Sequence, residues 1–196
     1  MSKAFFIFAF ATLTLPSASS AAQCPTAASA KNGFSLLQEE VQSEFRPYHG
    51  PIVKIVNRFG TSQPQTVFSY RGLIDLSLID GDVQRANHPL SDLSGVFPLK
   101  KGSRHDLSFV SLNKDENAGT EYTYRLEVVG QETFELGDCK YKVLRVKQTT
   151  MRGAEKLDVW TALYSPDLAA TVARIYDEGT AQEDTVAYER IRLLQR

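Results

Sequence analysis

The sequence predicts a mainly β protein in which one antiparallel sheet, curved or formed into an open barrel, accompanies one N-terminal helix. Segments of alternating apolar and polar residues recur along the chain, and turn residues separate them at even spacing. Only one segment has helical spacing, so the strands follow one another without helices between them, as in antiparallel sheets. The composition, with 42% hydrophobic and 23% charged residues in 196, is that of an ordinary globular protein.

The first 22 residues have the features of a secretory signal peptide. Lys3 gives a basic start, an apolar run extends from Ala4 to Leu15, and small residues fill Ser17–Ala22. The run is shorter than the roughly 20 residues that cross a bilayer. We therefore expect cleavage after Ala22 and export of the remaining chain, with the periplasm as its destination.

Residues 23–196 are predicted to form a single β-rich domain, because no internal repeat or second boundary is visible. No later segment has the roughly 18 consecutive apolar residues of a membrane span. Gln23 stands directly before Cys24, where a lipidation signal requires a small residue, so we expect neither a spanning segment nor a lipid anchor. The net charge of -1 excludes a generally basic surface, and we expect no nucleic-acid partner.

Cys24 and Cys139 are the only two cysteines in the sequence. In an exported protein such a pair indicates a disulfide, and neither cysteine belongs to a C-x-x-C motif. Two thiols are also too few for a structural zinc site unless histidines complete it. The alternative is a pair of buried, unpaired thiols. We expect the bridge, which would tie the N-terminus to the sheet.

The expected helix lies near residues 33–46. Four apolar residues there recur at spacings of three, four and four, which places them on one helical stripe: Phe34, Leu37, Val41 and Phe45. Arg46, just before Pro47, should be its last residue, because proline disfavours helical geometry in the residue that precedes it.

Beyond Pro51 the period of the pattern changes to two. The clearest alternation runs through Tyr122–Val128, and glycine-containing turns separate the segments. The other expected strands are Ile74–Leu78, Leu157–Leu163, Ile52–Phe59, Thr66–Arg71, His105–Leu112, Lys140–Gln148, Thr171–Tyr176 and Thr185–Leu193.

Several of these strands are apolar or aromatic on both faces. Trp160 and Tyr164, four apart, share the face opposite Leu157 and Val159. Either the second face is covered by the helix or another sheet, or a curved sheet encloses space for something apolar. The candidate ligand or partner surface is aromatic, with packing in the core as the alternative: Trp160, Tyr164, Tyr122 and Tyr124.

The C-terminal half carries a series of strand and turn motifs. Glu121–Val128 is followed by Gly130, by the turn Glu135–Tyr141, and by the aromatic segment Val159–Ala169 with its Tyr-Ser-Pro-Asp-Leu ending; Phe97–Gly102 precedes them. Over residues 96–192 this order resembles the domain-of-unknown-function 3108 family and its relatives, exported β-sheet proteins of the bacterial envelope. Ala169-Ala170 departs from the glycine more usual there. The resemblance implies a fold and a compartment, and it carries over no catalytic residue because the family has no established reaction.

No motif for catalysis, metal binding or a cofactor is present. The three histidines, His49, His88 and His105, have no metal-ligand spacing, and neither a G-x-S-x-G nor a phosphate-binding glycine loop occurs. We therefore expect a protein that is not an enzyme and that needs no metal or cofactor. A histidine meeting a carboxylate and a serine in one pocket would revive a hydrolase.

The sequence thus favours a non-enzymatic envelope protein that binds an apolar or amphipathic ligand, or a protein partner, through its curved sheet. A structural or assembly factor of the cell envelope is the first alternative, and exposure of Trp160 or Tyr164 would favour it. A hydrolase is the second alternative.

Overall fold

The computed structural model describes residues 24–115 and 118–194, which form thirteen strands, one short helix and one 3-10 turn. The strands are β1 (Phe34–Gln38), β2 (Val41–His49), β3 (Ile52–Phe59), β4 (Gln65–Tyr70), β5 (Ile74–Asp80), β6 (Val83–Pro89), β7 (Arg104–Asn113), β8 (Thr120–Leu136), β9 (Cys139–Arg152), β10 (Glu155–Ser165), β11 (Ala170–Tyr176), β12 (Asp184–Ala187) and β13 (Arg190–Leu193). The helix is α1 (Ala27–Ala30) and the 3-10 turn is η1 (Ser94–Val96).

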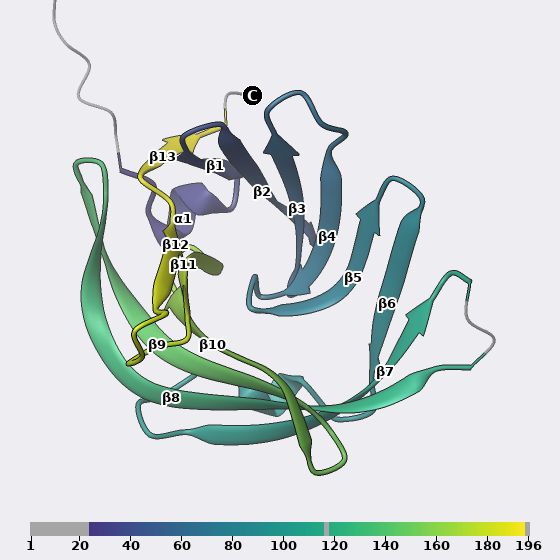
Figure 1. Cartoon of the computed structure of the whole chain (residues 1–196). Coiled ribbons are helices and arrows are strands. Elements are labelled where there is room, and N and C mark those ends of the chain that lie inside the picture. The colour runs from purple at the N-terminus through teal and green to yellow at the C-terminus, as the bar shows by residue number, and fades with distance from the viewer. Residues whose placement is uncertain (1–23, 116–117, 195–196) are drawn as a thin grey trace, which may run out of the picture.

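All thirteen strands belong to one antiparallel sheet, in the order β12-β11-β10-β9-β8-β7-β6-β5-β4-β3-β2-β1-β13. From β1 to β12 each strand pairs with the next along the chain, and only β13 returns to the far edge beside β1. The sheet bends strongly around a central space, with β1 to β4 facing the long strands β8 to β10 across it (Figure 1). The prediction of a mainly β fold with a curved sheet is confirmed. The sheet is not closed by a ladder, because β12 and β13 remain its edges.

The prediction of a helix near residues 33–46 is wrong, because this segment forms the hairpin of β1 and β2. Phe34 and Phe45 are cross-strand partners, and their rings stack with centroids 5.0 Å apart. The helical spacing of the apolar residues therefore arises from a hairpin whose turn, with Glu39 at φ 43°, brings the two halves together. The helix that the structure describes at the N-terminus is α1, whose single turn is capped by Thr26.

Most expected strands are present, some with different bounds. Ile52–Phe59 coincides with β3, and Tyr122–Val128 lies within the longer β8. The predicted strand Thr185–Leu193 is divided into β12 and β13. Strand β6 was missed because its residues, mostly exposed, show no apolar alternation.

The disulfide between Cys24 and Cys139 is present and joins residues 115 positions apart, as predicted. Beside it, the Tyr141 hydroxyl donates a hydrogen bond to the main-chain oxygen of Pro25 at 2.9 Å. Burial raises the pKa of Tyr141 to about 12. The bridge and this hydrogen bond hold the beginning of the domain against β9.

The segment between β12 and β13 crosses from one edge of the sheet to the other. The Tyr188 amide donates to the Val172 oxygen at 3.0 Å, and the Glu189 amide donates to the Leu37 oxygen at 2.8 Å. The Glu189 oxygen in turn accepts a hydrogen bond from the Gly137 amide. Tyr188 and Glu189 thus connect strands from opposite ends of the sheet. These contacts hold the two edges close together although no continuous hydrogen-bonded ladder joins them.

A second connection lies where the β4–β5 turn touches the turn that follows β10. The Tyr164 hydroxyl donates to the Arg71 oxygen at 2.9 Å, and the Thr171 hydroxyl donates to the Gly72 oxygen at 3.3 Å. Gly72 has a φ of 65°, and a Cβ atom there would lie 1.9 Å from the Ala169 oxygen. Only glycine allows this close approach of the two turns. We call this contact the turn clamp.

Apolar packing accompanies both connections. One buried cluster contains Leu36 of β1, Val143 of β9 and Val172 of β11. A second contains Leu126 of β8 and Ala162 of β10, with residues of β5 and β7. The core is thus distributed around the bend of the sheet.

The predicted signal peptide, residues 1–22, and its cleavage after Ala22 lie outside the described residues. Within residues 24–115 and 118–194, no helix has the length and apolar character needed to cross a membrane.

Replacement of Gly72 by alanine tests the turn clamp. Gly72→Ala should lower the free energy of unfolding by more than about 2 kcal/mol, because the methyl group collides with the Ala169 oxygen and φ is left-handed. Gly153→Ala is the matched control, since Gly153 has a φ of 60° and no atom within 4 Å of its Cβ position. Gly153→Ala should lower the free energy of unfolding by about 1 kcal/mol. Equal losses in urea unfolding would contradict a close approach at Gly72.

Candidate functional site

Two cavities lie on the inner side of the bend. The first has a volume of about 400 Å³ and is lined from β1 to β6 and from β11 and β12. The second has about 410 Å³ and is lined from β5 to β10. Asp75, Arg85 and Asn87 belong to the walls of both, so the two cavities adjoin there, and we call this place the junction. Each volume falls within the roughly 300–1,000 Å³ of small-molecule sites.

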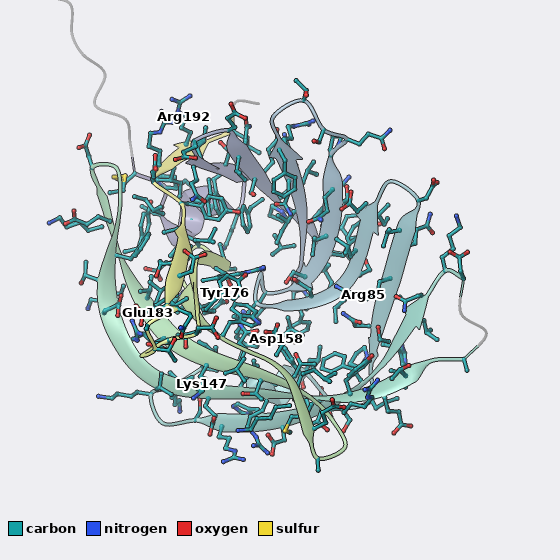
Figure 2. All side chains as sticks on the ribbon, viewed as in Figure 1. Arg85, Lys147, Asp158, Tyr176, Glu183 and Arg192 are labelled. Atoms are coloured by element: carbon teal, nitrogen blue, oxygen red, sulfur yellow. A yellow bond between two sulfur atoms is a disulfide. The ribbon has the colours of Figure 1, made fainter. Side chains whose placement is uncertain are left out.

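The sheet register places the lining residues of the second cavity on one face. Asn87 pairs with Ser111 on the neighbouring strand, and Thr150 of β9 pairs with both Tyr124 and Asp158. Directly opposed residues of an antiparallel sheet project from the same face. Figure 2 shows the labelled Arg85, Asp158 and Tyr176 directed from β6, β10 and β11 toward the enclosed space, whereas Lys147 points outward.

The structure brings together three of the four aromatic residues that the sequence analysis selected. Tyr122, Tyr124 and Trp160 all line the second cavity. Tyr164 does not, because it is 2% exposed and its hydroxyl is used in the turn clamp. Tyr164 is therefore a core residue, which was the alternative given for these aromatic residues. Its ring lies against Phe97, with centroids 6.1 Å apart.

The aromatic wall of the second cavity is ordered by contacts between rings. Phe109 and Tyr124 meet edge to face, with centroids 6.3 Å apart. Trp160 lies 6.4 Å from Tyr176, and the guanidinium of Arg174 stands 4.7 Å from the indole centroid. This cation–π contact covers part of the indole and holds it against the inner side of the sheet.

Charged residues of both signs surround the junction of the cavities. The Arg174 Nη2 atom lies 4.0 Å from Asp75 Oδ2, and each side chain is 45% exposed. Desolvation lowers the pKa of Arg174, but Asp75 together with Tyr176 and Tyr124 raises it, and the net shift is upward. Burial, with a smaller contribution from Asp75, raises the pKa of Tyr124. A fixed cation and a neutral phenol therefore face the junction.

Arg85 and Asp158 are exposed at this site, and neither side chain has a hydrogen bond or ion pair with another described residue. They lie on β6 and β10, on opposite sides of the second cavity. Both remain available to a ligand.

A chain of hydrogen bonds runs along the first cavity. Ser43 donates to the Asn57 side-chain oxygen at 2.7 Å, so the Tyr188 hydroxyl must donate to Ser43, 2.6 Å away. Asn57 then donates to Gln65 at 2.9 Å, and Gln65 donates to Asp80 at 3.1 Å. Burial raises the pKa of Tyr188. The chain orders polar groups across β2 to β5.

Beside this chain the first cavity has an apolar floor. Phe45, Ile55 and Val67, from β2, β3 and β4, are each less than 10% exposed and line the cavity. The first cavity thus presents apolar and hydrogen-bonding surfaces side by side.

The sequence analysis missed the polar lining, chiefly Asp75, Arg85, Asn87 and Arg174. The alternation in the expected strand Ile74–Leu78 does not tell whether the face that carries Asp75 meets solvent or an interior. Strand β6, which carries Arg85 and Asn87, gave no strand signal. No histidine among the described residues lines either cavity, so the serine, histidine and carboxylate arrangement of a hydrolase does not form there. Within the same residues, no group of three or more His, Cys, Asp or Glu is placed to hold a metal ion.

No protein-family model matches the chain, and no curated protein matches it. Among solved structures, the chain is similar to the hypothetical lipoprotein YmcC from Escherichia coli K12, at 12% identity and a TM-score of 0.48. The similarity covers 81% of this chain and 83% of that chain. At this level it assigns no function, and the resemblance to the domain-of-unknown-function 3108 family stays a prediction.

Loss of the Ser43 hydroxyl tests the hydrogen-bond chain. Ser43→Ala should lower the free energy of unfolding by about 1–3 kcal/mol, because it leaves the Tyr188 hydroxyl and the Asn57 side-chain oxygen without their hydrogen-bond partner. Ser77→Ala serves as the control, since Ser77 lines the same cavity without a side-chain hydrogen bond to a described residue. It should change stability by less than about 0.5 kcal/mol. Equal effects of the two variants in urea unfolding would contradict the chain.

Proposed function

We propose that this protein is a non-enzymatic binding protein of the cell envelope that holds an amphipathic ligand inside its curved sheet. The pair of adjoining cavities carries the proposal. Together they offer the apolar floor of Phe45, Ile55 and Val67 and, beyond the junction, an aromatic and charged wall.

The charges favour an amphipathic ligand over a purely apolar one. Asp75, Arg85, Asp158 and Arg174 would all be shielded from water by a ligand that filled the cavities. Covering charges with apolar groups is costly unless the ligand returns hydrogen bonds. A ligand with an apolar part and a polar part satisfies both ends of the site.

The envelope location draws support from the disulfide. Bridges of this kind persist in oxidising compartments such as the periplasm. Because the Cys24 sulfur is bonded to Cys139, it is not available for a lipid, which supports a chain without an anchor at that position. Export itself rests on the sequence of residues 1–22.

The alternative of a structural or assembly factor was tied to exposure of Trp160 or Tyr164. Tyr164 is buried, and Trp160 is half-buried in a cavity wall, where its ring faces the cavity rather than an outer surface. We therefore place ligand binding first.

Trp160 is the only tryptophan in the chain and lines the second cavity, so its fluorescence reports on ligand entry. We expect titration with n-octyl β-D-glucoside, n-octylphosphocholine or octanoate, each below its micelle-forming concentration, to give a saturable change for at least one of them. Asn87→Phe, which fills the junction, should weaken that binding at least tenfold, and the outward-facing control Lys147→Ala should leave it unchanged. The absence of a saturable change with all three amphiphiles would refute the proposal, as would unweakened binding by Asn87→Phe.

A further inference from the structure

The second cavity combines flat aromatic surfaces with unoccupied hydrogen-bonding groups. Tyr122, Tyr124 and Trp160 supply the rings, and the Trp160 indole is braced by Arg174 on the side of the first cavity. An aromatic face carries partial negative charge, so it attracts the weakly positive C–H groups on the face of a saturated ring.

The polar groups of this cavity are free to accept and to donate. Ser111, Asn113, Thr150 and Asp158 line it, and none of their side chains has a hydrogen bond to another described residue. Hydroxyl and amide groups both donate and accept, whereas the carboxylate only accepts. A ring bearing several hydroxyl groups, each a donor and an acceptor, matches such a mixture.

The net charge of the lining residues favours neither an anionic nor a cationic ligand. Over the two cavities together, Asp75 and Asp158 balance Arg85 and Arg174, so the formal sum is zero. Arg174 lines the first cavity and reaches the second through its contact with the Trp160 ring. A site built for a phosphate or carboxylate head group would carry an excess of cations, and one for an ammonium group would carry an excess of acids. The balance favours an uncharged, strongly hydrogen-bonding group.

We propose that the second cavity binds a sugar ring, and that the ligand of the proposed function is therefore a glycolipid-like amphiphile. The inference rests on the proposed function and names the chemical class of its ligand. The sugar lies against Tyr122 and Trp160 and hydrogen-bonds to Asp158 and Thr150 across it. The apolar part of the ligand lies over Phe45, Ile55 and Val67 in the first cavity.

The experiment compares amphiphiles that share one tail. Isothermal titration with n-octyl β-D-glucoside, n-octyl β-D-maltoside, n-octylphosphocholine and octanoate should show at least tenfold tighter binding of a glycoside than of the other two head groups. Asp158→Ala should weaken glycoside binding about tenfold and change octylphosphocholine binding less than twofold. Because Asp158 is exposed and its side chain makes no hydrogen bond or ion pair with another described residue, the variant should keep the wild-type unfolding temperature.

Tyr122→Leu is a second variant, which removes a stacking ring and keeps the apolar bulk, and it should also weaken glycoside binding selectively. Lys147→Ala should match the wild-type protein for every amphiphile. Equal affinities for all four amphiphiles would overturn the sugar site while leaving the proposed function standing. A glycoside preference that survives in both Asp158→Ala and Tyr122→Leu would also overturn it, whereas no binding of any amphiphile would overturn both proposals.

Discussion

The turn clamp between Gly72 and Ala169 is the contact on which the bend of the sheet depends. A thirteen-stranded antiparallel meander could twist open, because its neighbouring strands fix only local geometry. The clamp joins the middle of the sheet to the turn between β10 and β11, with hydrogen bonds from Tyr164 and Thr171. The Tyr188-Glu189 segment joins the two edges in addition. Both connections hold the inner face at a distance that leaves two cavities.

The bend also explains why the inner face carries so many polar side chains. A flat sheet covered on one side would bury that face completely, and its alternation would be strictly apolar within. Here the inner surface divides between the buried residues beside the turn clamp and a hollow whose Asp75 and Arg174 side chains are each 45% exposed. Asp75, Arg174 and the Ser43–Asn57–Gln65 chain occupy that hollow, where they satisfy one another in part and leave Arg85 and Asp158 for a ligand.

Much of the fold was predictable because its signals are local. The alternation through Tyr122–Val128 and the pairing of two cysteines needed no knowledge of distant contacts. The spacing of Phe34 and Phe45 led to the wrong prediction of a helix, because a short hairpin and a helix can both bring residues at this spacing onto one side. The cavity could not be predicted, since whether Asp75 or Arg85 faces solvent or an interior depends on the curvature. That curvature is fixed by hydrogen bonds between residues 93 and 99 positions apart, which no local pattern encodes.

The central claim, that the bent sheet encloses a ligand, is tested most directly by native mass spectrometry of the protein purified gently from the cells that make it. We expect a reproducible extra mass that denaturation removes and that fragments into a sugar and an apolar part. A released mass that contains no sugar would support the proposed binding function and contradict the proposal that its ligand carries a sugar. A polypeptide with no added mass, which differs from its calculated value only by the two hydrogens lost to the disulfide, would contradict the account.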